Sequence, residues 1–474
     1  MYIQDLTLSK FRCFEHASLS FRTPTGEALD PAILPNVTLV IGGNGAGKTT
    51  ILKGIALALL SPMLQDSGFR PRFLVRRSRK SQDDATATIR GRAVFHWQDF
   101  GERTPDDLAR PADVGVELVR IADTERLDWG MAHGLLQGVT LREVARAAAE
   151  PVRRRQRADG LGSISLEDLA GRMQRAMFSN TSPACFLVGY GATRRVESSE
   201  RFDPSAREKS RSPRYQRVAG LFEDHVALTP LAAWLPRLNN PGREKQVKQL
   251  LTAMLPERCR FTGERQGSDY LFDLDGSRMP FDALSDGFRA YIGWVADMLY
   301  HVCLGCPTGV KLDAYRGVIL VDEIDLHLHP AWQRVVVTQL SRALPLMQFV
   351  LTSHSPIVAG SAEPTNVRLL RQAGKEGAMA IEESGAPLFG LNATQILESP
   401  YFGLPSTRAP IAVQSLKRLA RRAQGGDSAA GLDFLKALAG DRRRLTGVLR
   451  PEPPPPTRRR TPATKRTKKK GRGS

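Results

Sequence analysis

The sequence has few cysteines and no long apolar run. Its five cysteines are an odd number and are scattered, apart from Cys303 and Cys306 in HVCLGCP. A single C-x-x-C supplies half of a zinc site at most, so we interpret these cysteines as reduced residues near a helix end at Gly305 and Pro307. No apolar stretch approaches the roughly 18 to 20 residues of a membrane span. The N-terminus, with Asp5, lacks the pattern of a signal peptide. We expect a cytoplasmic protein without a membrane partner.

Acidic residues are outnumbered by basic ones, and the net charge is +19. The segment after Arg450, PEPPPPTRRRTPATKRTKKKGRGS, holds nine basic residues and one acid. It is too poor in apolar residues to form a core, so we expect a disordered basic tail. Such a tail either contacts nucleic-acid phosphates or only keeps the chain soluble. The other 450 residues carry +11, which favours a basic surface on the body as well.

The stretch GGNGAGKT matches G-x-x-x-x-G-K-[ST] between an apolar strand and a helix. Glycines in such a loop let backbone N–H groups surround phosphate oxygens, and the helix N-terminus adds positive potential. Lys48 would supply a charge to the β- and γ-phosphates, and Thr49 a hydroxyl to Mg²⁺. The sequence therefore predicts an ATP site with Mg²⁺. The expected nucleotide-binding residues of this loop are Gly42, Asn44, Gly45, Ala46, Gly47, Lys48, Thr49 and Thr50.

The stretch GVILVDEIDLHLHP, residues 317–330, carries a buried strand into Asp322 and Glu323. A P-loop nucleotidase needs such an acidic element on a neighbouring strand. Asp322 would hold Mg²⁺ through its water shell, and Glu323 would polarise the attacking water as a general base. Adjacent acids repel one another without a cation nearby, so the pair itself favours Mg²⁺.

Two histidines, His327 and His329, follow in an H-x-H pattern. On a strand they would face one way and could begin a zinc site, but no third ligand cluster lies nearby. In ATPases of the ABC type, the residues after the catalytic glutamate form a loop that crosses the dimer interface. His329 stands after Leu328 where those ATPases typically have Leu-Asp. We interpret His329 as an interface residue and keep metal binding as the alternative.

Two further segments resemble ABC-type ATPases. ALSDGFRAYIGW is similar to the signature LSGGQ, and it places Leu284, Ser285 and Gly287 at the start of an amphipathic helix, where an anion is favoured. The resemblance implies that this anion is the γ-phosphate bound by the other subunit. FVLTSHSP ends a strand at His354, which resembles the switch histidine that contacts the γ-phosphate. The alternatives are an ordinary Ser-capped helix and a structural histidine.

One position departs from the ABC pattern. Such ATPases place a glutamine after the strand that leads out of the nucleotide-binding lobe, but GYGAT here puts Thr193 there, followed by Arg194 and Arg195. Gln98 in HWQDF is an alternative for this lobe-coupling residue. The arginines could contact nucleotide, a partner or DNA.

The motif order, together with the opening LTLSKFRCFEHASLSF, resembles the RecF/SMC-like branch of ABC ATPases over roughly residues 1–370. No heptads lie between Lys48 and Asp322, which excludes long coiled coils. The chain looks more like RecF, the OLD nucleases and the ATPases of anti-phage systems such as Septu. The resemblance implies an α/β ABC-type P-loop head, with a mixed and parallel sheet and flanking helices, plus a helical lobe. OLD nucleases carry a D-x-D after the switch histidine, whereas here that pattern occurs only at Asp273–Asp275, in an expected hairpin. Any nuclease is therefore expected to be a separate partner.

The expected assembly is a homodimer or higher oligomer that sandwiches ATP. ATP binding would favour the closed state, and hydrolysis would release it. We expect the ATPase or sensor subunit of an anti-phage complex with a separate nuclease effector. The alternatives are a RecF-like DNA-repair ATPase that binds DNA, a transport ATPase, and a scaffold with little turnover. In the sandwich, Lys48, Thr49, Asp322, Glu323 and His354 act in one subunit, and Leu284, Ser285, Gly287 and His329 act from its neighbour.

The chain is long enough for several lobes. We expect a P-loop lobe with a helical insertion over 1–195, a helical signature lobe over 196–310, and the Walker B and switch-histidine part over 311–385. A helical region over 386–450 and the tail over 451–474 follow. Residues 100–180 are expected to be mostly helical, with TLREVARAAAEPVRRRQRA the clearest helix, and 196–216 a mobile loop. LFEDHVALTPLAAWLPRL is expected to be helical, and Asp275-Gly276 marks a hairpin turn.

Overall fold

The computed structural model of the chain divides into two compact units, Met1–Gly403 and Leu404–Ser474. It describes residues 1–24, 34–64, 67–77, 85–100, 110–128, 176–177, 179, 182–196, 212–373, 378–383, 388, 390–399 and 402–438. The helix expected at 140–158, most of the loop expected at 196–216, and the basic tail lie outside these residues. The five expected regions stay a prediction.

A six-stranded sheet forms the centre of the first unit, in the order β16-β15-β3-β14-β13-β7. Five strands are parallel, and β16 pairs antiparallel with β15 at one edge. Every residue of β3, β13 and β14 is buried, because helices or a second sheet cover both faces. The predicted mixed and parallel sheet is confirmed. The strands are β3 (Val37–Gly42), β7 (Leu187–Tyr190), β13 (Gly317–Val321), β14 (Met347–Ser353), β15 (Val367–Ala373) and β16 (Ala378–Glu383).

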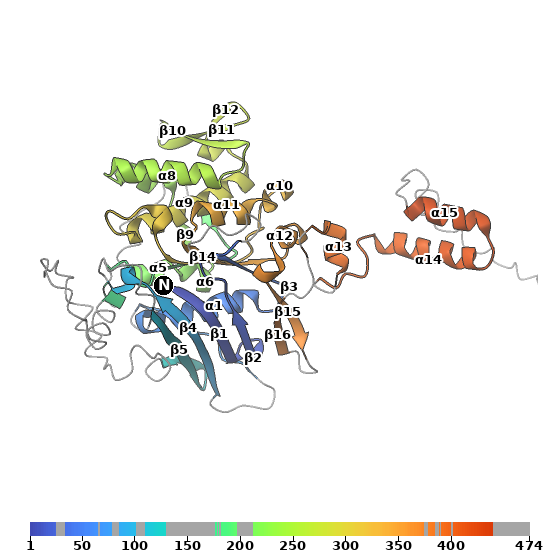
Figure 1. The fold of residues 1–474 in the computed structure, drawn as a ribbon, viewed down its shortest axis with the longest axis horizontal. Helices are drawn as coiled ribbons and strands as arrows, with labels where there is room; N and C mark the ends of the chain where they lie inside the picture. Colours follow the sequence, from blue (N-terminus) through green and yellow to red (C-terminus); the bar gives the residue numbers. More distant parts are fainter. Residues whose placement is uncertain are drawn as a thin grey trace, which may run out of the picture. The chain divides into compact units, whose positions relative to one another are not determined.

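Helix α1 (Lys48–Leu64) packs between this sheet and an antiparallel sheet of order β2-β1-β4-β5-β6 (Figure 1). Val40 and Val350 of the central sheet pack into the core that α1 shares with the second sheet. Their neighbours Ile41 and Leu351 face the opposite way, into a core made with the helical layer. This alternation is the period of two that strands impose. The strands of the second sheet are β1 (Tyr2–Phe11), β2 (Phe14–Ser20), β4 (Ala85–Phe95), β5 (Arg110–Ile121) and β6 (Thr124–Asp128).

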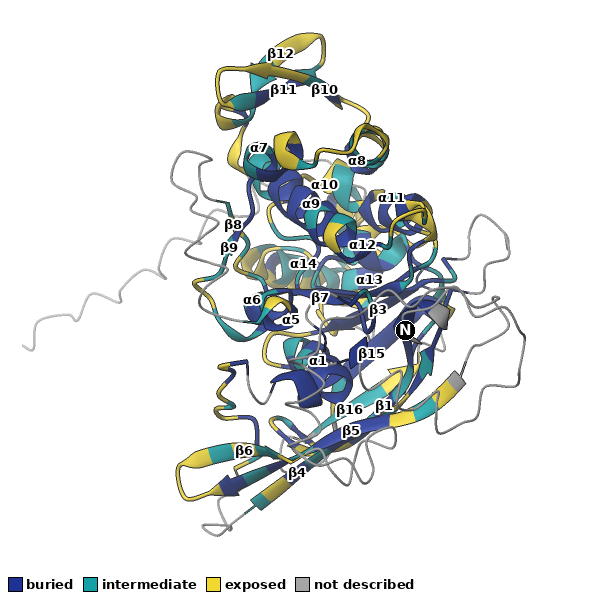
Figure 2. Ribbon diagram, turned by 90° about the vertical axis from the view of Figure 1, so that its left-hand side faces the viewer, coloured by how far each residue is buried: buried dark blue, intermediate teal, exposed yellow. Residues whose placement is uncertain are grey.

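A helical layer covers the other face of the central sheet. Figure 2 shows that α9 is largely buried and that the hairpin above it is partly exposed. In that hairpin, Asp275 and Gly276 have φ of 53° and 87°, so the predicted tight turn is present. The main helices are α8 (Pro241–Met254), α9 (Asp286–Gly305) and α11 (Val336–Ala343), and the hairpin strands are β10 (Cys259–Gln266), β11 (Asp269–Leu274) and β12 (Ser277–Pro280). Shorter elements are η1 (Trp97–Phe100), β8 (Arg195–Val196), α5 (Pro213–Gln216), α6 (Ala219–Phe222), β9 (Ala227–Leu228), α7 (Leu231–Trp234), α10 (Pro330–Gln333), α12 (Pro356–Gly360) and α13 (Ala393–Glu398).

Two predictions of helix were wrong. Residues 110–128 form the long β5–β6 hairpin rather than a helix, and β5 pairs with β4 from Arg110 to Arg120. Its alternating pattern, with Val114, Val116 and Leu118 buried, is the signal that was missed. LFEDHVALTPLAAWLPRL breaks into α6, β9 and α7: the chain turns extended at Glu223 and starts a new helix after Pro230.

The second unit contains two helices that pack on each other, α14 (Pro410–Gln424) and α15 (Ser428–Leu438). Both lie in the region that the sequence predicted to be helical. A short turn joins them. Arg422 closes this turn by donating from Nε at 3.1 Å and from Nη2 at 2.6 Å to Asp427 Oδ2. None of the helices in the described part of the chain combines the length and apolar character that a bilayer crossing requires.

The six-stranded sheet and the five-stranded sheet are joined by the side chain of Gln348 on β14, which is fully buried. Its Nε2 donates to the carbonyls of Ile3 and Arg22 at 2.7 Å each, and its Oε1 accepts from the Ile3 amide at 2.8 Å. Gln348→Leu keeps the volume but strands these backbone groups, so unfolding free energy should fall by about 3 kcal/mol in denaturant titrations. Gln372→Leu, at an exposed position of β15, is the matched control and should change stability little. Equal stability of the two variants would contradict the role of Gln348.

Candidate functional site

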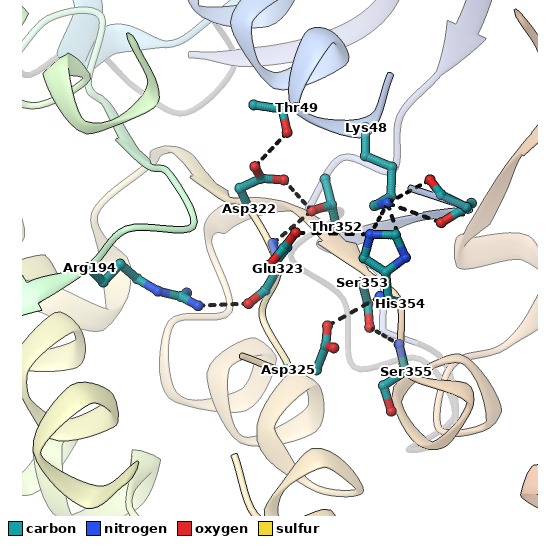
Figure 3. A network of polar contacts seen from close by, with 12 residues as sticks. Lys48, Thr49, Arg194, Asp322, Glu323, Asp325, Thr352, Ser353, His354 and Ser355 are labelled. Carbon is teal, nitrogen blue, oxygen red and sulfur yellow. Dashed lines mark hydrogen bonds and ion pairs between the residues drawn. The ribbon is translucent and has the colours of Figure 1, made fainter. Parts of the chain in front are cut away.

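The register of the parallel strands brings three distant motifs to one edge of the central sheet. Ile41 of β3 pairs with Ser353 of β14, and Val321 of β13 pairs with Leu351. The three strands therefore end together, and the residues that follow them converge (Figure 3). The glycine-rich loop follows β3, the two acids follow β13, and His354 follows β14.

The glycine-rich loop leads directly into α1, and two of its glycines are required by its backbone. Gly45 and Gly47 have φ of 75° and 99°, in the region that L side chains rarely adopt. A Cβ on Gly47 would also lie 2.9 Å from the Phe14 ring. The loop encloses Lys48, whose Nζ donates to the carbonyls of Gly42 at 3.0 Å and Gly43 at 3.2 Å. The loop thus has the backbone of a phosphate cradle.

Asp322 links the start of α1 to β14. Thr49 Oγ1 donates to one carboxylate oxygen at 2.6 Å, and Thr352 Oγ1 donates to the other, also at 2.6 Å. Asp322 is 4% exposed, so these short bonds replace most of its water. Thr352 was not among the predicted residues. Its position two residues before His354 was the available signal.

Glu323 has an unusual backbone, with φ of 49°. A left-handed conformation costs a residue with a side chain roughly 1–2 kcal/mol. Two side chains hold it there: Thr352 Oγ1 accepts from the Glu323 amide at 2.8 Å, and Arg194 Nη2 donates to the Glu323 carbonyl at 2.7 Å. The carboxylate lines the open side of the site, 4.0 Å from His354 Nε2.

His354 stands between cation and carboxylates. Its ring contacts Lys48 Nζ, and Asp325 Oδ1 accepts from its backbone amide at 3.3 Å. Burial, and then the Lys48 charge, lower the pKa of His354. Burial also lowers the pKa of Lys48, although Asp322 and Glu323 oppose the effect. The neutral imidazole is therefore favoured near neutral pH, and Asp325 is a further residue that the sequence did not single out.

An open hollow of about 740 Å³ lies over the glycine-rich loop. Asn44, Thr50, Glu323 and His354 line it, together with most of the loop. Its outer wall is basic and was not predicted. This wall includes Arg12, Lys53, Arg76 and Arg77, with the exposed ring of Phe73 beneath the Arg77 guanidinium. A hollow with a phosphate cradle at its floor and cations along its wall suits a polyphosphate.

Two family models match parts of the chain. One, described as "AAA domain, putative AbiEii toxin, Type IV TA system", matches residues 186–359, and one described as "AAA domain" matches residues 5–87. The Retron Ec83 probable ATPase of Escherichia coli is 23% identical over 415 residues, 79% of this chain and 72% of that protein. Septu protein PtuA of Bacillus mycoides (strain KBAB4) is 26% identical over 225 residues, 48% of this chain and 30% of that protein.

The chain is an ATPase, and its fold fits an ABC-type P-loop head. It resembles the ATPases of anti-phage systems, as the motif order predicted, and the nucleotide it binds is ATP. DNA replication and repair protein RecF of Idiomarina loihiensis is more distantly similar, 25% identical over 150 residues, 28% of this chain and 39% of that protein. A solved SMC head bound to the C-winged helix domain of ScpA has a TM-score of 0.41 and 14% identity, covering 81% of this chain and 97% of that one. That likeness is too low to decide the fold, which rests on the strand order.

The structure does not bring all the predicted site residues of the ATPase together. Leu284, Ser285, Gly287 and His329 do not line the hollow. Ser285 is exposed at the N-cap of α9, and its hydroxyl makes no capping bond, so it is open to a ligand. Leu284 is 4% exposed and packs in the core, so that its side chain is not available to a nucleotide. Gly287 lies against the loop after Glu323, since a Cβ there would be 2.8 Å from the His327 carbonyl.

The H-x-H histidines serve the backbone in this structure. His329 Nδ1 accepts from the Ala331 amide at 3.2 Å and caps α10, and His327 has φ of 63°. In the described residues, no group of three or more His, Cys, Asp or Glu side chains is arranged to hold a metal ion. Cys303 and Cys306 are free thiols, and α9 ends at Gly305 as predicted.

Neither candidate for the lobe-coupling glutamine lines the hollow. Gln98 lies in η1, where it is buried and its Oε1 accepts from the Arg316 amide at 3.4 Å. Thr193 is exposed, beyond the end of β7. The residue next to it, Arg194, instead reaches Glu323 (Figure 3).

Gly47→Ala should abolish ATP binding by the ATPase, because the new Cβ has no room and the backbone conformation disfavours it. Gly43 is the matched control in the same loop: a Cβ there meets nothing within 4 Å. Titration calorimetry with ATP should show at least about a 100-fold loss of affinity for Gly47→Ala, since several backbone donors move, and little change for Gly43→Ala. Comparable affinity of the two variants would show that the loop does not cradle the phosphates.

Proposed function

We propose that two copies of this ATPase close on ATP, and that this switch drives an anti-phage complex that includes a separate nuclease. One observation carries the two-copy part. Lys48, Thr49, Asp322, Glu323 and His354 gather at one hollow, whereas the exposed hydroxyl of Ser285 is presented elsewhere. A second copy can supply that hydroxyl to the γ-phosphate. The names of the Retron and Septu relatives favour the defence setting.

The site residues fit Mg²⁺ and a triphosphate. Thr49 and Asp322 offer only oxygen donors, already 2.6 Å apart, and oxygen ligands are those that Mg²⁺ prefers. When bound, Mg²⁺ would neutralise charge that develops on the phosphates during cleavage. Lys48 would contact the β- and γ-phosphates in place of the loop carbonyls it now bonds. Glu323 would accept the proton of the attacking water, and His354 would contact the γ-phosphate.

The proposed partner nuclease follows from what the acids of this chain do. Asp273 and Asp275, the only D-x-D in the sequence, serve the hairpin: Asp273 Oδ1 accepts from the Gly276 amide at 2.8 Å, and Asp275 pairs with Arg258. Both therefore have a local structural role. The cytoplasmic location remains a prediction.

A mixing experiment tests the two-copy site. Lys48→Ala removes the phosphate contact of one copy, and Ser285→Arg blocks the helix tip that its neighbour would offer. Each variant should lose turnover alone, but a mixture contains dimers in which one site has both intact parts. We expect phosphate release to recover in the mixture. Lys48→Ala mixed with Glu323→Gln is the control. Lys48 and Glu323 act in the same copy, so neither site of a mixed dimer is intact and the mixture should stay inactive. No recovery with Ser285→Arg would contradict the sandwich.

A second candidate function, nucleic-acid binding as in a RecF-like repair ATPase, is favoured by where the charge lies. Residues 404–474 hold 19 basic and four acidic residues, a net +15, so residues 1–403 carry only +4. Helix α14 has four basic residues and no acid. Arg422 is paired with Asp427, but Lys417, Arg418 and Arg421 are exposed and close together. A cluster of unpaired cations is what phosphate backbones attract.

Replacing Lys417, Arg418 and Arg421 by alanine should weaken binding to a fluorescent DNA duplex about tenfold at low salt, and should flatten the salt dependence of the affinity. ATP turnover without DNA should be unchanged. The control removes three exposed cations from the first unit and should have a smaller effect. These are Arg70, Arg260 and Lys311. Equal loss in both triple variants would contradict a site on α14.

A further inference from the structure

Arg194 is a partly buried cation whose main contact is a backbone carbonyl. It follows β7, and its Nη2 donates to the Glu323 carbonyl at 2.7 Å. Its Nη1 is buried and has no hydrogen-bond partner among the described residues. Burial lowers the pKa of Arg194 to about 10, although Asp322, Asp325 and Glu323 oppose the effect. A guanidinium that holds one carbonyl while another of its nitrogens is buried without a hydrogen bond needs an explanation beyond stability.

The carbonyl it holds belongs to the residue in the strained conformation. Glu323 is fixed at its amide by Thr352 and at its carbonyl by Arg194, and its φ is 49°. The direction of the carboxylate is set by these two bonds, because it follows the peptide planes on either side. Thr352 is anchored to Asp322 and cannot yield alone. We call these two bonds the clamp on Glu323, and Arg194 is the part of the clamp that can move.

Arg194 is also attached to the signature helix. Its guanidinium lies over the Trp294 ring of α9, 5.7 Å from the ring centre. At the other side of the same turn, Tyr190 Oη donates to Asp297 Oδ2, also on α9, at 2.8 Å. The end of β7 is thus fastened to α9 on both sides. The N-terminus of that helix carries Ser285.

We propose that Arg194 is a positioning residue that makes the direction of Glu323 depend on the placement of α9. A phosphate that draws on Ser285 shifts α9, Trp294 moves with the helix, and the guanidinium shifts the Glu323 carbonyl. Arg194 then takes the lobe-coupling place that a glutamine holds in other ABC ATPases, acting on the backbone of the base instead of on the nucleotide. The inference rests on the proposed role of Glu323 as general base.

Arg194→Ala and Arg194→Lys should be compared with Arg195→Ala, whose side chain is the exposed neighbour. Loss of the clamp should lower kcat about 10- to 100-fold, as small misplacements of a reacting group do, while KM for ATP and the calorimetric Kd change little. Lysine, which can still donate one bond, should restore part of the rate. Arg195→Ala should match the natural protein.

Hydrogen exchange gives a readout that does not depend on turnover. The Ile324 amide donates to Thr352 and the Leu326 amide to Glu323, and both should lose protection in Arg194→Ala. The amides of β13 should keep theirs, which separates a local clamp from general unfolding. If Arg194→Ala does not fold, the lysine variant decides by the same two measurements.

The outcomes separate the two proposals. Normal kcat and normal exchange in Arg194→Ala would overturn the inference. A large loss of ATP affinity with unchanged kcat would also overturn it, because Arg194 would then be a ligand contact. If Glu323→Gln retains full turnover, the proposed role of Glu323 fails, while the exchange data still report on the clamp.

Discussion

The carboxylate of Asp322 is the contact on which the rest of the site depends. It takes one hydroxyl from the start of α1 and one from β14, each at 2.6 Å, and so joins the three strands' ends where they emerge from the core. Both bonds are possible only because β3, β13 and β14 are parallel and in a register that ends them together. When parallel strands are covered on both faces, polar side chains can reach a ligand only at the strand ends. The chemistry is therefore placed by the sheet, not by the loops alone.

The electrostatics of the hollow are those of a site prepared for a large anion. Burial lowers the pKa of Lys48, Lys53 and His354, so each charged form is disfavoured until a counter-charge arrives. Arg12 and Lys48 add to the cost because they are neighbouring cations. A bound triphosphate would supply the counter-charge that favours the charged forms.

The sequence was a good guide where local chemistry determines local structure. A few neighbouring residues are enough to recognise the glycines around Lys48, the apolar strands and the Asp275-Gly276 turn. The ABC-type fold follows from the order of the motifs. Contacts set by pairing between distant segments were missed. Thr352 reads as an ordinary strand residue until β14 is laid beside β13. Arg194 was expected to contact nucleotide, a partner or DNA, and its bond to the Glu323 carbonyl was not predicted. The β5–β6 hairpin was missed because its partner β4 is what makes it a strand.

The clamp on Glu323 also explains why a left-handed residue stands at this point. An extended residue would carry β13 onward and carry the carboxylate with it, away from His354 and Lys48. The turn at Glu323 instead ends the strand and begins the loop that reaches His327, whose carbonyl meets Gly287 at the start of α9. The backbone that carries the proposed base is thus in contact with α9 at two places, through Arg194 and through the loop itself. A helix held at both points cannot move without altering that backbone, and this makes α9 the natural route by which a second copy would control hydrolysis.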